Sequence, residues 1–381
     1  LLYESMLNTA LQKPNNVVIR FHGECITYRD LLNQVNQFAR GLSTIGVVSG
    51  KTVALLLPNC PQFTVSYYST TALGGLCVPA NPLLKPKELE YIWQDSRAEV
   101  VITTSALLPN VREAISDLPW TVTIISVDCN PDSDNQLLYF NDMITGSSDT
   151  LDVSGIDDRS AAVCIYTSGT TGRPKGALLS HFNLTENCRQ VTRALQFDDT
   201  DNFMCVLPLF HSFAGTVCQN TSIFVGASFT IMEQFHPTKV LETVQSAKTT
   251  IFCGVPTMYG ALLQFPADQY DFSSTRLCVS GGAPMPAAVM ASFEAKYKTI
   301  MIEGDGPTEC GPVTSINPID GVRKVGSVGP PLPGVQIKIF DDNNQEVPTN
   351  DLGEIVVKGD NVMIGYLNLP KETEEAFAGG W

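Results

Sequence analysis

The sequence predicts an α/β protein with two doubly wound, mainly parallel α/β lobes and a small antiparallel β subdomain. Nearly continuous apolar segments alternate with segments of helical periodicity, and this alternation occurs in both halves of the chain. Buried strands separated by helices are typical of a mainly parallel sheet that is covered on both faces. From Val325 the chain is rich in glycine and proline, and short strands with a turn follow. A length of 381 residues also favours two or three lobes over a single core.

The first predicted lobe comprises residues 1–158. It begins with a hairpin at residues 17–27, in which His22 is expected to be a turn residue. Thr27 is expected to cap the next helix, because Asp30 follows three residues later and apolar residues then recur at helical spacing. The strands and helices that follow are predicted at residues 52–57, 61–73, 76–79, 86–95, 99–103 and 121–126.

The second predicted lobe comprises residues 159–324, and we expect the two lobes to be interleaved. Its strands are predicted at residues 161–165, 203–207, 228–232, 250–255, 277–280 and 299–302, and a helix at residues 237–247. Residues 325–381 form the predicted β subdomain, in which the segments 335–340 and 353–358 have the pattern of antiparallel strands.

The composition narrows the possible function classes. A hydrophobic content of 44% and a charged content of 17% are typical of a globular enzyme. The net charge of −15 argues against general nucleic-acid binding, although a local cradle can still bind a nucleotide. The 11 cysteines are scattered singly and the 4 histidines lie far apart, so neither set predicts a metal site. Because no signal peptide or membrane-spanning apolar run is visible, we expect a cytoplasmic protein with reduced thiols.

A loop rich in glycine and hydroxyl groups follows the apolar strand at residues 161–165. Residues 166–176 read Tyr-Thr-Ser-Gly-Thr-Thr-Gly-Arg-Pro-Lys-Gly. Glycines let the backbone N–H groups approach an anion, the hydroxyls add short donors, and Lys175 adds a mobile positive charge. The loop is not a Walker A motif, because Pro174 precedes the lysine and no Gly-Lys-Ser/Thr occurs. A flexible surface linker is the alternative, but such linkers rarely lie between two apolar strands.

This loop resembles the signature of the acyl-adenylate-forming (AMP-binding) superfamily, and the chain is most similar to its fatty acyl-CoA synthetases. Residues 84–89 and 365–368 resemble two further motifs of that superfamily. The resemblance implies that the loop binds the β- and γ-phosphates of ATP. The loop residues concerned are Thr167, Ser168, Gly169, Thr170, Thr171, Gly172 and Lys175.

Residues 304–309 resemble the superfamily motif that follows the last buried strand. The resemblance implies that Thr308 contacts the α-phosphate and that Glu309 binds Mg²⁺, a metal that prefers oxygen ligands. By themselves, these residues favour an ordinary Gly-Pro turn with a solvated glutamate. Further nucleotide contacts are implied for Gly282, Ala283, Pro284, Gly304, Asp305 and Gly306. Asp305 departs from the pattern, because the superfamily usually has an aromatic residue there that stacks on adenine.

The acid substrate is implied to lie between two further segments. Phe210 and His211 are expected to face the carboxylate and the acyl chain, and Gly281 and Gly282 to form an open pocket wall. A histidine between aromatic residues is more often part of a core, so this role depends on the resemblance. No aspartate that could hold an amino group occurs in residues 210–215, which favours an apolar, fatty acid substrate.

The implied reaction has two steps: an acid and ATP give acyl-AMP and pyrophosphate, and CoA then displaces AMP. Thr308, Glu309, His211 and Lys175 are the expected catalytic residues, with ATP/AMP, Mg²⁺ and CoA as ligands. In the superfamily a hinge and a C-terminal lid follow the Gly380-Trp381 position, and neither is present in this sequence. We therefore expect this chain by itself to bind its ligands but to turn over poorly.

Several alternatives remain open at this point. Within the superfamily, the chain could be an aryl-CoA ligase, or a fatty acyl-AMP ligase that passes its product to a carrier protein. Outside it, a nucleotide-binding module or a P-loop kinase is conceivable, although the missing Gly-Lys-Ser/Thr counts against the kinase. A noncatalytic interaction protein on a degenerate adenylation domain is a further alternative, which Asp305 supports. The sequence does not predict the oligomeric state.

Overall fold

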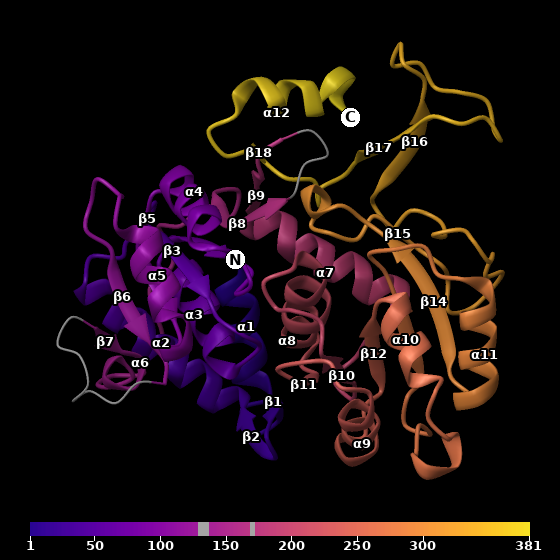
Figure 1. The fold of residues 1–381 in the computed structure, drawn as a ribbon, viewed down its shortest axis with the longest axis horizontal. Helices are drawn as coiled ribbons and strands as arrows, with labels where there is room; N and C mark the ends of the chain where they lie inside the picture. The colour runs from indigo at the N-terminus through magenta and orange to yellow at the C-terminus, as the bar shows by residue number, and fades with distance from the viewer. Residues whose placement is uncertain (129–136, 168–171) are drawn as a thin grey trace.

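The computed structural model describes residues 1–128, 137–167 and 172–381 of the chain. These residues form two large sheets and one small sheet, with helices between and outside the large sheets (Figure 1). Most strand pairs of the large sheets are parallel, and the small sheet is antiparallel. The predicted fold class is therefore confirmed.

The first large sheet has the strand order β18-β9-β8-β4-β3-β5-β6-β7. Its strands are β3 (Thr52–Leu56), β4 (Leu76–Pro79), β5 (Ala98–Thr103), β6 (Thr123–Ser126), β7 (Leu138–Tyr139), β8 (Ala161–Thr167), β9 (Lys175–Ser180) and β18 (Gly365–Tyr366). β8 is parallel to β4 but antiparallel to β9, and β9 is antiparallel to β18. The sheet thus changes direction at the strand that leads into the glycine-rich loop.

The second large sheet has the strand order β15-β14-β13-β12-β10-β11-β1-β2. Its strands are β1 (Val17–Phe21), β2 (Glu24–Thr27), β10 (Asn202–Cys205), β11 (Ser228–Ile231), β12 (Ile251–Gly254), β13 (Leu277–Ser280), β14 (Ile300–Asp305) and β15 (Ser315–Ile316). The five neighbours from β14 to β11 run parallel, so their carboxyl ends meet at one edge of the sheet. Ligands of open α/β sheets bind at such an edge.

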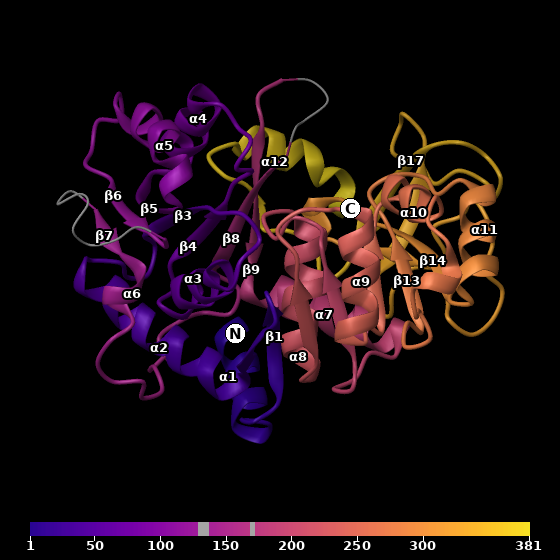
Figure 2. The same ribbon diagram turned by 60° about the horizontal axis from the view of Figure 1, so that its bottom comes forward.

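The large sheets share a central layer of helices and one hydrophobic core. This layer contains α1 (Leu2–Gln12), α2 (Tyr28–Thr44), α3 (Pro61–Ala72), α7 (His181–Leu195), the π-helix η3 (Ala214–Asn220) and α8 (Thr221–Val225). In both ribbon views α7 and α8 lie between the two sheets (Figures 1 and 2). Because the central core takes residues from β3 and from β10, the sheets are parts of one packed body.

Each large sheet also has an outer layer of helices. The first is covered by α4 (Pro86–Ser96) and α5 (Leu108–Ile115), and the second by α9 (Pro237–Ala247), α10 (Pro256–Leu262) and α11 (Ala287–Tyr297). Strand β3 shows why the sequence has continuous apolar runs. Val53 and Leu55 belong to the central core while Ala54 and Leu56 belong to the outer one, so both faces of the strand are buried.

The small sheet consists of β16 (Gln336–Phe340) and β17 (Glu354–Lys358) and is followed by α12 (Pro370–Ala376). The remaining short helices are η1 (Ser105–Leu107), α6 (Phe140–Met143), η4 (Ala267–Gln269), η5 (Thr308–Cys310) and η6 (Ala378–Gly380). In the described part of the chain, none of the helices combines the length and apolarity that a membrane span requires.

The strand partners show how segments from different parts of the chain combine in the two large sheets. The hairpin of β1 and β2, expected in the first lobe, joins the second sheet because β1 pairs with β11. The strands β8 and β9, expected in the second lobe, join the first sheet. The boundary predicted at residue 158 therefore does not separate the two sheets. The predicted cap at Thr27 is confirmed, since its side chain accepts a hydrogen bond from the Asp30 amide.

Candidate active site

The glycine-rich loop connects the antiparallel strands β8 and β9, and Thr167 and Lys175 face each other across its base. Two side chains of α4 support these strands. The Tyr166 hydroxyl donates to Asp95 at 2.6 Å, and the Tyr91 hydroxyl donates to the Pro174 carbonyl at 3.1 Å. A rigid base thus fixes where the loop begins and ends. Of the predicted phosphate ligands, Thr167, Gly172 and Lys175 are described, whereas Ser168, Gly169, Thr170 and Thr171 lie outside the described residues.

A short turn brings Glu309 to the base of this loop. The turn η5 follows β14, and Oε1 of Glu309 accepts hydrogen bonds from Tyr366 at 2.8 Å and from Thr167 at 3.4 Å. Oε2 of Glu309 accepts no hydrogen bond from the described residues. The structure therefore brings together Thr167 and Glu309, which the sequence analysis assigned to one nucleotide site.

Thr308 points to a different neighbour from the same turn. Its hydroxyl lies 3.1 Å from the hydroxyl of Ser212, which follows His211 after β10. The turn therefore lies between the glycine-rich loop and the segment that carries His211. Thr308 is within reach of both the predicted phosphate site and the predicted acid site.

Glycine is required where the turn passes Pro312. A Cβ atom at Gly306 would lie 1.8 Å from the Pro312 carbonyl oxygen, which no side chain can accommodate. At Gly304 the space is also tight, since a Cβ would lie 3.0 Å from the Ile316 side chain. The two glycines therefore let the turn that leads to Thr308 and Glu309 pack closely against residues 312–316.

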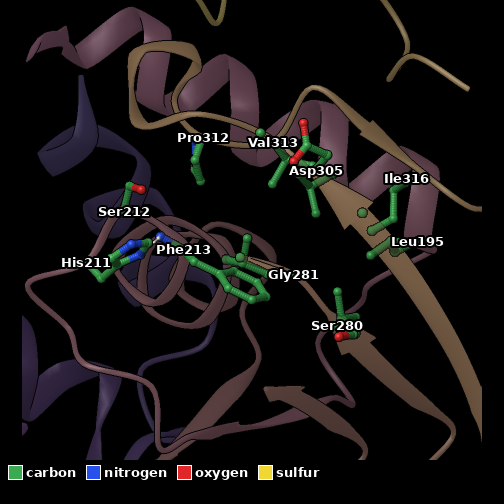
Figure 3. Close-up of a pocket in the computed structure, with 16 residues that line it drawn as sticks. Leu195, His211, Ser212, Phe213, Ser280, Gly281, Asp305, Pro312, Val313 and Ile316 are labelled. Atoms are coloured by element: carbon green, nitrogen blue, oxygen red, sulfur yellow. Dashed lines mark hydrogen bonds between the residues drawn. The ribbon is translucent and has the colours of Figure 1, made fainter. Parts of the chain in front are cut away.

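A mainly apolar cavity of about 60 Å³ lies beside this turn. Figure 3 shows His211, Ser212 and Phe213 on one side of it and Asp305, Val313 and Ile316 on the other. The remaining residues of its wall are Val191, Leu195, Val217, Val279, Ser280, Gly281, Gly282, Gly304, Gly306 and Pro312. The cavity is therefore formed by α7, the π-helix η3 and the carboxyl ends of β13 and β14.

His211 is held as a neutral imidazole. Its Nδ1 accepts a hydrogen bond from the Phe213 amide at 3.2 Å, so the proton of the neutral ring is on Nε2. The side chain keeps an exposed face, but the surrounding protein atoms displace enough water to lower the pKa of the imidazole. A neutral ring with an Nε2–H donor can bind a carboxylate oxygen without a strong ion pair.

The other sequence-predicted residues fall into two groups. Gly281, Gly282, Gly304 and Asp305 line the cavity, whereas Ala283 and Pro284 are exposed beside it. Phe210 does not line the cavity but packs against the central core. Phe213 takes its place, and its ring lies where a Cβ at Gly281 would be 3.2 Å away. The loop after β10 turns through Pro208 and His211, which the strand pattern could not predict.

Sequence reasoning also missed Tyr366. Burial raises the pKa of its phenol, and the hydrogen bond to Glu309 raises it further, so the hydroxyl is a donor. The Lys175 ammonium lies 5.1 Å from the centre of the Tyr366 ring. The resemblance of residues 365–368 to a superfamily motif marked this segment but gave the tyrosine no role.

The two interleaved sheets, the hairpin loop and the adjoining cavity define an adenylate-forming enzyme fold. Within this class, the chain belongs to the AMP-binding enzyme family, whose model matches residues 7–367. The superfamily resemblance noted in the sequence is therefore confirmed.

Similar proteins include several CoA ligases. A long-chain-fatty-acid–CoA ligase of Bacillus subtilis (strain 168) is 33% identical over 409 residues, covering 100% of this chain and 73% of the relative. A feruloyl-CoA synthase of an Amycolatopsis species is 33% identical over 375 residues, covering 98% of this chain and 72% of the relative. The crystal structure of the anthranilate CoA ligase AuaEII with anthranoyl-AMP superposes with a TM-score of 0.93 at 28% identity, covering 100% of this chain and 73% of that one.

Proposed function

We propose that this protein activates an apolar carboxylic acid with ATP to an acyl-adenylate and transfers the acyl group to CoA. The observation that carries the proposal is the convergence of Thr167, Thr308 and Glu309 beside an apolar cavity that His211 borders. A loop rich in glycine and hydroxyl groups can bind phosphate oxygens, and an apolar cavity can bind the apolar part of a carboxylic acid. The similarity to CoA ligases supports CoA as the acceptor.

The phosphate end of the nucleotide would be held by the glycine-rich loop. Thr167, Gly172 and Lys175 would bind the β- and γ-phosphates, and Thr308 the α-phosphate. Asp305 borders the cavity. An adenine ring would approach at this position, and an aspartate side chain cannot stack on that ring. Its carboxylate can instead accept a hydrogen bond from the amino group of adenine.

Glu309 has the features of a Mg²⁺ ligand. Its Oε2 accepts no hydrogen bond within the described part of the chain, while Tyr366 and Thr167 hold Oε1. No cluster of three or more potential metal-binding side chains occurs in the described residues, so phosphate oxygens and water would complete the coordination. When bound, Mg²⁺ would neutralise charge on the phosphates.

In the first step a carboxylate oxygen of the acid attacks the α-phosphorus of ATP, and the bond to pyrophosphate breaks. Nε2–H of His211 would hold the other carboxylate oxygen, while Lys175 binds the charge that develops on pyrophosphate. In the second step the CoA thiolate attacks the acyl carbon and the bond to AMP breaks. Catalysis would come mainly from positioning and from charge stabilisation.

A fatty acid is our first candidate substrate, because the cavity wall is apolar and the Bacillus subtilis relative is a long-chain-fatty-acid–CoA ligase. An aryl acid is the second candidate. The cavity of about 60 Å³ is compact, and the Phe213 ring borders it beside the flat surface of Gly281. A flat ring would need less rearrangement of this wall than an extended chain.

Thermal unfolding with ATP, Mg²⁺ and nonhydrolysable acyl-adenylate analogues tests the proposal. At 100 times its dissociation constant, a ligand should stabilise the fold by about 2.7 kcal/mol. We expect one class of analogue, alkyl or aryl, to stabilise the protein well beyond ATP alone. The variant Glu309→Gln should lose the part of the ATP effect that depends on Mg²⁺. If neither ATP nor any analogue raises the melting temperature, the proposed function is wrong.

A further inference from the structure

Tyr366 lies between Lys175, at the base of the glycine-rich loop, and Glu309, in the turn after β14. It belongs to β18, in which Tyr366 pairs with Ala177 of β9. On either side of this pair, the Ile364 amide donates to the Leu178 carbonyl and the Leu367 amide to the Gly176 carbonyl, both at 2.8 Å. The backbone therefore holds the Tyr366 side chain next to the strand that carries Lys175.

A second set of contacts fixes the same segment to the Glu309 turn. The Met363 amide donates to the Glu309 carbonyl at 2.7 Å, and the Asn361 side chain donates to the Cys310 carbonyl at 2.7 Å. Asn361 is fully buried. The segment around β18 thus joins the strand after the glycine-rich loop to the turn with the acidic side chain.

The Tyr366 side chain contacts both charged groups. Its hydroxyl donates to Oε1 of Glu309 at 2.8 Å, and its ring lies 5.1 Å from the Lys175 ammonium. In the described part of the chain, neither Lys175 nor Glu309 forms an ion pair. Two oppositely charged side chains, Lys175 and Glu309, thus contact the same tyrosine but not each other.

A direct ion pair between these groups would oppose ligand binding. Lys175 would then be neutralised before a phosphate arrives, and Glu309 before a metal ion arrives. Separating such a half-buried pair has a large cost, because each charge loses its partner. Contacts with an aromatic ring and a phenolic hydroxyl are weaker, so a phosphate and a divalent cation can displace them.

We propose that Tyr366 is a positioning residue that keeps Lys175 and Glu309 apart and available for phosphate and metal. This inference rests on the proposed function. Its hydroxyl orients the carboxylate, and its ring holds the ammonium in the absence of nucleotide. Lys175 leaves the ring when the phosphates bind.

Two substitutions at this position separate the roles of the ring and the hydroxyl. Tyr366→Phe keeps the ring, so the dissociation constant of ATP in EDTA should stay within about twofold of that of the unchanged protein. The Mg²⁺ concentration needed for half-maximal ATP binding should rise roughly three- to tenfold, as expected for one lost hydrogen bond. Tyr366→Leu removes both contacts, so ATP binding in EDTA should also weaken by about tenfold.

A double variant shows whether the loss of ATP affinity in Tyr366→Leu comes from an ion pair between Lys175 and Glu309. In Tyr366→Leu/Glu309→Gln no carboxylate can capture Lys175, so the affinity for ATP in EDTA should return to within about twofold of that of the unchanged protein. The matched control is Tyr297→Phe, which removes a hydroxyl that bonds to the Leu262 carbonyl on the far side of the second sheet. This control should leave every ATP affinity unchanged.

Isothermal titration with ATP, in EDTA and over a range of Mg²⁺ concentrations, gives all of these values. The inference is overturned if Tyr366→Leu binds ATP in EDTA as tightly as the unchanged protein. It is also overturned if Glu309→Gln does not restore the affinity, since the loss would then be structural. Failure of the unchanged protein to bind ATP would instead contradict the proposed function itself.

Discussion

The imidazole of His181 is fully buried at the start of α7, behind the first turn of α1. Its Nδ1 accepts a hydrogen bond from the Leu2 amide at 3.4 Å, and its Nε2 has no partner among the described residues. Burial lowers the pKa of this imidazole to about 4. The ring therefore stays neutral in the folded protein well below the pH at which a solvated histidine gains a proton.

This pKa predicts a loss of stability in mild acid. Below about pH 6.5 the unfolded chain binds a proton at His181 and the folded chain does not, so the free energy of unfolding falls as the pH falls. The loss is complete at about pH 4, where the folded protein is protonated too. Its upper limit is about 3 kcal/mol.

Urea unfolding of the protein and of His181→Gln, between pH 7 and pH 4, measures this effect. Carboxylates contribute to the slope in both proteins, so the difference between the two curves isolates His181. We expect the variant to lose less stability than the unchanged protein over this range. Parallel curves would show that His181 does not titrate as its burial implies.

At the scale of elements, the turn between β14 and β15 sets the geometry of the site. It places Thr308 and Glu309 next to Ser212 and Thr167, and it fits only because Gly306 passes directly over the Pro312 carbonyl. A side chain at this glycine must displace backbone rather than a flexible neighbour. A change at this glycine should therefore affect both the stability of the fold and the positions of Thr308 and Glu309.

The substitution Gly306→Ala should destabilise the fold by roughly 2 kcal/mol and weaken ATP binding, because relief of the clash moves the turn. The matched control is Gly260→Ala in α10, where an added Cβ would meet no atom within 4 Å. In that helix, alanine should be neutral or stabilising by up to about 1 kcal/mol. Thermal unfolding with and without ATP compares the two. Equal behaviour of both variants would contradict the role given to the turn.

The elements of the fold could be predicted because their cause is local. The strands of both large sheets are buried on two faces, which produces the continuous apolar runs in the sequence. The partners of those strands depend on contacts far along the chain, so the place of β1 beside β11 could not be predicted. The antiparallel direction of β9 could not be predicted either, because the hydrophobic periodicity of a strand does not distinguish a parallel from an antiparallel neighbour.

The candidate site was predictable to the extent that its motifs are local. Thr167, Thr308 and Glu309 were named from two short motifs, and the structure brings them together. Phe213 rather than Phe210 lines the cavity, a difference that the sequence could not predict because the loop after β10 has no period from which side-chain direction can be inferred. Tyr366 was missed because its partners lie on two other segments.

At the scale of the whole molecule, the two large sheets share one core and exchange strands along the chain. The first sheet contains β8, β9 and β18 from the later part of the sequence, and the second contains β1 and β2 from its start. The central core takes side chains from both sheets and from α7 between them (Figure 2). Neither sheet can therefore be completed by a continuous half of the chain.

A fragment of residues 1–158 should accordingly fail to fold by itself. Its β4 would lack β8 as a neighbour, and its β1 would lack β11. Unpaired strand edges and an open core leave too little buried surface for cooperative folding. Circular dichroism on heating should show no sharp transition, whereas the 381-residue chain should melt cooperatively. A cooperative melt with dispersed amide resonances would show that the fragment is an independent domain.

The pairing of β18 with β9 also has a consequence for synthesis. The hairpin with the glycine-rich loop leaves the ribosome long before Tyr366, although the two are neighbours in the finished sheet. Domains generally fold as they emerge, and contacts between distant residues form late. A nascent chain can therefore assemble much of both sheets while Glu309 still lacks the hydroxyl that orients it. The contacts of Tyr366 with Lys175 and Glu309 can therefore form only after residue 366 has been translated.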